Sequence, residues 1–128
     1  MLKLVETHIE VNDVRKSIDL YSRLFAHKDI ITWAEGNVSV LVLEDGSAFG
    51  CWKKGQIGLH NGRGGAHVHY AFQIQADEYL KYFNVIKDCG LTPIEHEWET
   101  GDKSLYFFDY DGNQGEFITT DWITLNDL

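Results

Sequence analysis

Two separated stretches of the chain carry side chains that could bind a metal ion. Residues 64–74 contain His67 and His69, and residues 106–117 contain Glu116. Alternate residues of a strand point to opposite faces, so the two histidines share one face and leave the other to apolar neighbours. Imidazole and carboxylate groups held by separate strands converge with the rigidity that coordination needs. The two stretches therefore predict a metal site on the polar face of a sheet.

Hydrophobic spacing in the first half predicts the elements that would position part of this site. Residues 5–11 alternate between apolar and polar side chains, which is typical of a half-buried strand, and Asp13 is a suitable N-cap for the helix that follows. The last turn of this helix is predicted to contain His27 and Lys28, because cations suit the negative end of a helix dipole. Three short strands separated by turn residues are then expected at residues 30–33, 38–43 and 48–52.

The second half repeats this order after a glycine-rich connector. The strand that ends at Ile74 leads to a helix from about Asp77, and Gly90 is a left-handed stop for that helix. Three further strands are predicted at residues 94–98, 105–109 and 115–119, with turns rich in Gly, Asp and Asn between them. The sequence thus predicts an α+β chain built from two tandem βαβββ modules.

The modules are expected to form one domain over residues 1–128, with a curved, cup-shaped mixed sheet and its helices on the outer face. Module one spans about 1–54, the connector about 55–66, module two about 67–120, and the tail 121–128. Polar faces of the two modules would line one cleft, which would receive five chemically active side chains: Glu6, His8, His67, His69 and Glu116.

Composition excludes several classes of protein. A formal net charge of −9 without a basic cluster repels phosphate backbones, so nucleic-acid binding is not expected, while a small-molecule partner remains open. No apolar run is long enough to span a bilayer, and the N-terminus becomes charged too early for a signal peptide, so no membrane association and a cytoplasmic location are expected. The two cysteines, Cys51 and Cys89, are expected to be reduced thiols.

Three motifs resemble the vicinal oxygen chelate superfamily, which includes lactoylglutathione lyases, extradiol dioxygenases, fosfomycin-inactivating enzymes and bleomycin-resistance proteins. They are residues 12–21, which enter the first helix, residues 69–72 in the fifth strand, and residues 104–116. The third motif is the most specific, because it resembles the superfamily's Tyr-Phe-x-Asp-Pro-Asp-Gly-Asn-x-x-Glu. Tyr110 stands where proline is usual, which changes the stiffness of a turn rather than its chemistry. The resemblance covers nearly the whole chain.

The resemblance implies metal ligands at His69 and Glu116 and a third ligand on the first strand, seven positions before Asp13. That count reaches Glu6, whereas many relatives have histidine there and this chain has His8 two residues later on the same face. Both remain candidates for the third ligand, and His67 is interpreted as a neighbour of the site. A further carboxylate position of some lyases falls near Cys51. One carboxylate with one or two imidazoles favours Mn, Fe, Ni or Zn.

The implied function is that of a divalent-metal-dependent enzyme of the glyoxalase type, a lyase or transferase that acts on a small molecule. Glu6 or Glu116 is a candidate general base, and Tyr106 a candidate hydrogen-bond donor to the substrate. By resemblance, the chain is expected to form a homodimer.

The alternative function is a metal-free antibiotic-binding protein of the bleomycin-resistance type. Four tryptophans would then supply the stacking walls of the binding site. A structural protein that has kept the fold and lost the chemistry is a third possibility. These tryptophans are Trp33, Trp52, Trp98 and Trp122.

Overall fold

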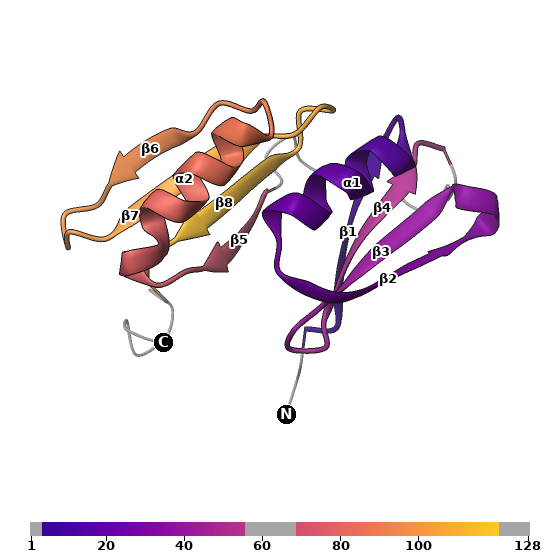
Figure 1. The fold of residues 1–128 in the computed structure, drawn as a ribbon, viewed down its shortest axis with the longest axis horizontal. Helices are drawn as coiled ribbons and strands as arrows, with labels where there is room; N and C mark the ends of the chain where they lie inside the picture. The colour runs from indigo at the N-terminus through magenta and orange to yellow at the C-terminus, as the bar shows by residue number, and fades with distance from the viewer. Residues whose placement is uncertain (1–3, 56–68, 121–128) are drawn as a thin grey trace. The chain divides into compact units, whose positions relative to one another are not determined.

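The computed structural model describes residues 4–55 and 69–120. The chain divides into two compact units, Met1–Ala66 and His67–Leu128. In both units one helix covers one face of a four-stranded sheet (Figure 1).

The first unit has the predicted order of strand, helix and three strands. Its strands pair in the order β1-β4-β3-β2, with β1 parallel to β4 and the other neighbouring strands antiparallel. A 3₁₀ turn, η1, joins β2 to β3. The bounds are β1 Glu6–Val11, α1 Val14–Leu24, β2 His27–Trp33, η1 Ala34–Gly36, β3 Val38–Leu43 and β4 Ala48–Lys53.

The second unit repeats this topology. Its strands pair in the order β5-β8-β7-β6, again with the first and last strands parallel. A 3₁₀ turn, η2, precedes the helix, so α2 begins slightly later than the sequence predicts. The bounds are β5 His69–Gln73, η2 Ala76–Glu78, α2 Tyr79–Asp88, β6 Ile94–Glu97, β7 Lys103–Phe108 and β8 Gln114–Ile118. The predicted pair of βαβββ modules is confirmed.

The first helix begins as predicted but ends earlier. The carboxylate of Asp13 accepts a hydrogen bond from the backbone N–H of Lys16 at 3.0 Å, which satisfies one of the free amides of the first turn. The helix ends at Leu24 because Phe25 adopts an extended backbone, with φ −113° and ψ 127°. The prediction that His27 and Lys28 form the last helical turn is therefore wrong, since both residues lie in β2.

Aromatic packing identifies the covered face of the first sheet. Tyr21 of α1 lies 4.7 Å from Phe49 of β4 between ring centroids, and Phe25 lies 5.1 Å from the same ring. Phe49 pairs with Thr7 in the parallel register, so β1 residues that alternate with Thr7 point to the other face. Glu6 and His8 therefore lie on the face that α1 does not cover.

The second sheet is packed in the same way. Tyr82 of α2 lies 4.5 Å from the ring of Phe117, which places Phe117 on the helix-covered face. The buried ring of Phe107 packs on the same face against Gly115, where there is no Cβ to obstruct it. Glu116, between Gly115 and Phe117, consequently points to the opposite face. Gly90 has φ +81° just after α2, as predicted for the helix stop.

No helix among the described residues is long and apolar enough to cross a membrane.

Candidate functional site

The open face of the second sheet brings together the two strongest metal-ligand candidates. His69 begins β5, and Glu116 lies in the middle of β8, which runs parallel to β5. The Nε2 atom of His69 lies 3.5 Å from the Oε1 atom of Glu116. The imidazole side chain is 35% exposed and the carboxylate only 6% exposed. The site thus has a buried acceptor with an accessible imidazole beside it.

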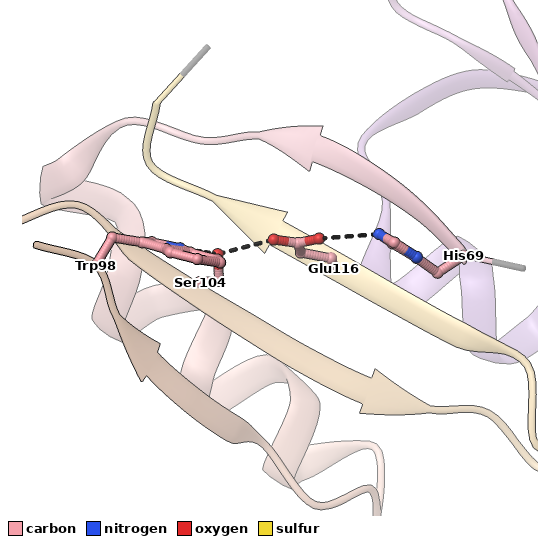
Figure 2. A network of polar contacts seen from close by, with 4 residues as sticks. All are labelled: His69, Trp98, Ser104 and Glu116. Atoms are coloured by element: carbon pink, nitrogen blue, oxygen red, sulfur yellow. Dashed lines mark hydrogen bonds and ion pairs between the residues drawn. The ribbon is translucent and has the colours of Figure 1, made fainter. Parts of the chain in front are cut away.

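A chain of hydrogen bonds holds the other oxygen of Glu116 (Figure 2). The indole N–H of Trp98 donates to Ser104 Oγ at 2.8 Å, and Ser104 Oγ donates to Glu116 Oε2 at 2.7 Å. An indole N–H can only donate, so it directs the hydroxyl proton of Ser104 toward the carboxylate. Ser104 has no exposed surface. Both oxygens of Glu116 are therefore engaged, one by Ser104 and one by His69.

Tyr106 faces the same carboxylate from β7. It pairs with Glu116 in the antiparallel register, and its side chain interacts with those of Glu116 and Ser104. Burial raises the pKa of the Tyr106 hydroxyl above its ordinary value of 10.0, and the negative charge of Glu116 raises it further. The phenol consequently stays protonated at neutral pH and is available as a hydrogen-bond donor.

The spacing of His69 and Glu116 fits a shared metal ion. Two ligand atoms that lie about 2.1 Å from one ion at a tetrahedral angle are about 3.4 Å apart. The observed separation of 3.5 Å is close to this value and is long for a hydrogen bond. Among the described residues no group of three or more His, Cys, Asp or Glu side chains gathers to form a complete site. His69 and Glu116 thus fit as two ligands of an ion that would need a further ligand.

The first unit holds a second imidazole–carboxylate pair on its own open face. His8 Nε2 lies 3.1 Å from Glu6 Oε2, and the indole N–H of Trp52 donates to His8 Nδ1 at 2.7 Å. The side chains of His8 and Glu6 are 27% and 59% exposed. Gly50 lies opposite His8, and a Cβ at Gly50 would overlap the imidazole ring. The ring therefore occupies space that only glycine leaves open on β4.

Strand register identifies corresponding positions in the two units. Glu6 opens the parallel pair of β1 with β4, as His69 opens that of β5 with β8. Gly46 and Gly112 are turn glycines with positive φ. Gly50 comes as many residues after Gly46 in the sequence as Glu116 comes after Gly112. By this correspondence, Glu6 occupies the position of His69, and Gly50 that of Glu116. Glu6 therefore stands at the position of the first module that corresponds to His69, and its role as a ligand stays a prediction.

The structure corrects the position expected for the extra carboxylate. The extra carboxylate position was expected near Cys51, but Cys51 is fully buried and lies on the helix-covered face, beside Phe49 in alternation. The corresponding open-face residue is Gly50, which has no side chain to act as a ligand. His67 and Trp122 lie outside the described residues. The shared cleft and the joint use of ligands from both modules stay predictions.

Sequence reasoning missed the role of Ser104. The residue lies within the motif that ends at Glu116, and alternation along β7 places it on the same face as Tyr106. A signal was therefore present, because a serine two residues before a tyrosine that faces a buried carboxylate is a natural hydrogen-bond donor. Trp98 was considered only as a stacking wall, and its N–H group instead begins the hydrogen-bond chain.

Comparison with known proteins identifies the fold. No family model matches the sequence, and no curated protein matches it. Among solved structures, the fosfomycin resistance protein FosX from Listeria monocytogenes is similar, with a TM-score of 0.76, 22% identity, and coverage of 100% of this chain and 99% of that one.

Two solved structures of other kinds are also similar. A glyoxalase/dioxygenase from Nostoc punctiforme has a TM-score of 0.71 at 19% identity, covering 91% of this chain and 90% of that chain. Lactoylglutathione lyase from Agrobacterium tumefaciens has a TM-score of 0.69 at 16% identity, with coverage of 91% and 92%. The chain therefore has the same fold as these proteins, as the resemblance in its sequence implied.

Proposed function

We propose that this chain is a divalent-metal-dependent enzyme that acts on a small molecule through one or two substrate oxygens. The observation that carries the proposal is the 3.5 Å approach of His69 Nε2 to Glu116 Oε1 on the open face of the second sheet. Two structures of the FosX protein from Listeria monocytogenes contain Mn(II), one with sulfate and one with dihydroxypropylphosphonic acid. Mn, Fe, Ni and Zn all suit this mixed nitrogen and oxygen donor set.

His69 and Glu116 would hold the ion together with a ligand from the first strand, for which Glu6 and His8 are the candidates. A bound ion would act as a Lewis acid toward a substrate oxygen. The hydrogen bond from Ser104 fixes the orientation of the Glu116 carboxylate, as outer partners of metal ligands commonly do. Glu116 is thereby suited to hold the ion rather than to transfer a proton.

Glu6 is a candidate for proton transfer as well as for metal binding, and Tyr106 is a candidate hydrogen-bond donor to the substrate. Glu6 is 59% exposed, so a substrate proton would have access to it, whereas Glu116 is nearly enclosed. The protonated hydroxyl of Tyr106 would donate a hydrogen bond to a substrate oxygen bound beside Glu116. These are the roles that the sequence analysis gave to Glu6 and Tyr106.

The metal-free alternative receives less support from the tryptophans than their number suggested. Trp52 and Trp98 both use their indole N–H groups in hydrogen-bond chains that end at a carboxylate. Such a chain orients a ligand-type group, which a purely aromatic binding wall does not require. This observation favours the metal-dependent function.

Metal analysis of freshly purified protein, followed by titration with Mn(II) after chelation, tests the proposal. We expect one binding site per chain, and we expect His69→Ala and Glu116→Gln to weaken binding by at least about 100-fold. His96→Ala is the matched control, because His96 lies on the same open face and its ring contacts Trp98 instead of the carboxylate. Equal binding by all four proteins, or no binding by the wild type, would contradict the proposal.

A panel of small molecules with vicinal oxygens then tests the reaction. Metal-dependent turnover that is lost in Glu116→Gln would support the enzyme, whereas tight ligand binding that persists after chelation would support the alternative. Sedimentation velocity on the same preparation tests the proposed homodimer.

A further inference from the structure

The hydrogen bonds in the first unit determine which nitrogen of His8 carries a proton. Trp52 donates its indole N–H to His8 Nδ1 at 2.7 Å, and the indole nitrogen has no acceptor capacity. Nδ1 must therefore present its lone pair to Trp52. In a neutral imidazole the proton then resides on Nε2, which faces Glu6 Oε2 at 3.1 Å. The arrangement is a directed relay from Trp52 through His8 to Glu6.

This relay is incompatible with metal ligation by His8. A metal ion binds an imidazole through the lone pair of one ring nitrogen. In His8 the lone pair of Nδ1 accepts the indole proton, and Nε2 carries a hydrogen that points to Glu6. Ligation through either nitrogen would break one of these two hydrogen bonds. The carboxylate of Glu6, by contrast, keeps its acceptor capacity when His8 donates to one of its oxygens.

The surroundings of His8 favour this ring position. Gly50 provides the space beneath the imidazole, because a side chain there would overlap it. Trp52 also meets the ring edge-on, with centroids 5.5 Å apart and an interplanar angle of 87°. These contacts come from β4, whereas His8 and Glu6 belong to β1, so the parallel strand pair holds the relay in register.

We propose that Trp52 and His8 are positioning residues that orient Glu6, and that His8 is not itself a metal ligand. The relay corresponds to the one in the second unit, where the Trp98 indole directs the Ser104 hydroxyl toward Glu116. The assignment of Glu6 as the first-strand ligand rests on the proposed function. The placement of the His8 ring nitrogens does not, because it follows from the hydrogen-bond geometry within the first unit.

Nitrogen-15 NMR of the histidine rings tests the relay without any metal. For the neutral ring we expect His8 to have its proton on Nε2 and a lone pair on Nδ1. His8→Gln identifies the signals of His8 by their absence. Trp52→Phe should shift His8 to a mixture of the two tautomers, while Trp33→Phe, which removes an exposed tryptophan of β2, should leave it unchanged. A proton on Nδ1 in the wild type would overturn the proposal.

Mn(II) titration distinguishes a positioning role of His8 from a ligand role, because the two roles predict different effects of Trp52→Phe on Mn(II) affinity. If His8 positions Glu6, Trp52→Phe should weaken Mn(II) binding about tenfold, as loss of an outer partner usually does. If His8 is a ligand, removal of the competing indole should leave binding unchanged or strengthen it, which would overturn the proposal. Trp33→Phe should retain wild-type affinity. A wild type that binds no Mn(II) would refute the proposed function and the ligand role of Glu6, while the NMR result would still decide the relay.

Discussion

The two modules use the same topology to place a carboxylate beside an imidazole, but they bury the carboxylate to different depths. In the first module Glu6 lies at the start of β1 with a side chain that is 59% exposed, and His8 is its partner. In the second module Glu116 lies on the interior strand β8 with a side chain that is 6% exposed, and His69 is its partner. Position within the sheet therefore decides whether the carboxylate meets solvent or is enclosed.

The residues in the middle of the two relays, Ser104 and His8, show the same difference in burial as the two carboxylates. Ser104 has no exposed surface and joins two groups across neighbouring strands, whereas His8 remains partly exposed. A buried hydroxyl that loses its acceptor incurs a desolvation cost, while an exposed imidazole can turn to water. The second module thus encloses its carboxylate and hydroxyl, whereas the first leaves its carboxylate and imidazole accessible to solvent.

Substitution of one glycine in each module should give the largest contrast. A methyl group in Gly115→Ala would overlap the fully buried ring of Phe107, and we expect a loss of about 3 kcal/mol in the free energy of unfolding. In Gly50→Ala the obstructed group is His8, which can rotate toward solvent, so a loss below about 1 kcal/mol is expected. Urea denaturation measures both, and equal losses would contradict the comparison.

The turn aspartates should give the next largest difference. Asp109 is 6% exposed, and its carboxylate accepts hydrogen bonds from the backbone N–H groups of Asp111 and Asn113 at 2.9 and 2.8 Å. Asp45 in the first module is exposed, and its carboxylate accepts hydrogen bonds from the backbone N–H and the hydroxyl of Ser47 at 2.9 and 2.6 Å. We expect Asp109→Ala to cost about 2 kcal/mol and Asp45→Ala less than about 1 kcal/mol. Thermal melts of the two variants decide the order, which the opposite ranking would refute.

Two buried serines distinguish the effect of a lost hydrogen bond on stability from its effect on metal binding. Ser104 and Ser39 are almost equally buried, but Ser39 forms its hydrogen bond with Thr32 at 2.8 Å instead of with a carboxylate. Ser104→Ala and Ser39→Ala should each cost about 1 kcal/mol. Only Ser104→Ala should also weaken Mn(II) binding, by about tenfold. Isothermal titration after a stability check provides the measurement, and loss of affinity in both variants would contradict a specific role for Ser104.

The smallest effect concerns the ionisation of Tyr106 in metal-free protein. Burial and the nearby charge of Glu116 raise its pKa above 10.0, so the folded chain retains the phenolic proton longer than the unfolded chain. The associated stability is present below pH 10 and is lost as the pH rises through the raised pKa. Ultraviolet difference titration of wild type minus Tyr106→Phe should show ionisation above pH 10. A midpoint at or below 10 would show that Tyr106 is not shielded beside Glu116.

Much of this molecule could be predicted because its determinants are local. Alternation along β5 placed His69 on the polar face, and Asp13 and Gly90 marked where helices begin and end. The turn motif before Glu116 was specific enough to indicate the superfamily fold. Hydrophobic periodicity and turn chemistry act within a few residues, so a single sequence contains them in readable form.

Other features depended on contacts between strands that are distant in sequence. The early end of α1 at Leu24 placed His27 in β2, against the local preference for a cation at a helix end. The register of β4 put Gly50 beneath His8 and turned Cys51 to the covered face, and a shift of one residue would have reversed both.

The sequence by itself determined the two βαβββ modules and the pairing of His69 with Glu116 as a candidate site, because alternation and turn residues specify strands and their faces. Only the tertiary structure decided that Trp98 and Trp52 each direct a donor toward a carboxylate. Hydrogen bonds between side chains depend on distances across the sheet, and strand pairing sets those distances after the chain has folded.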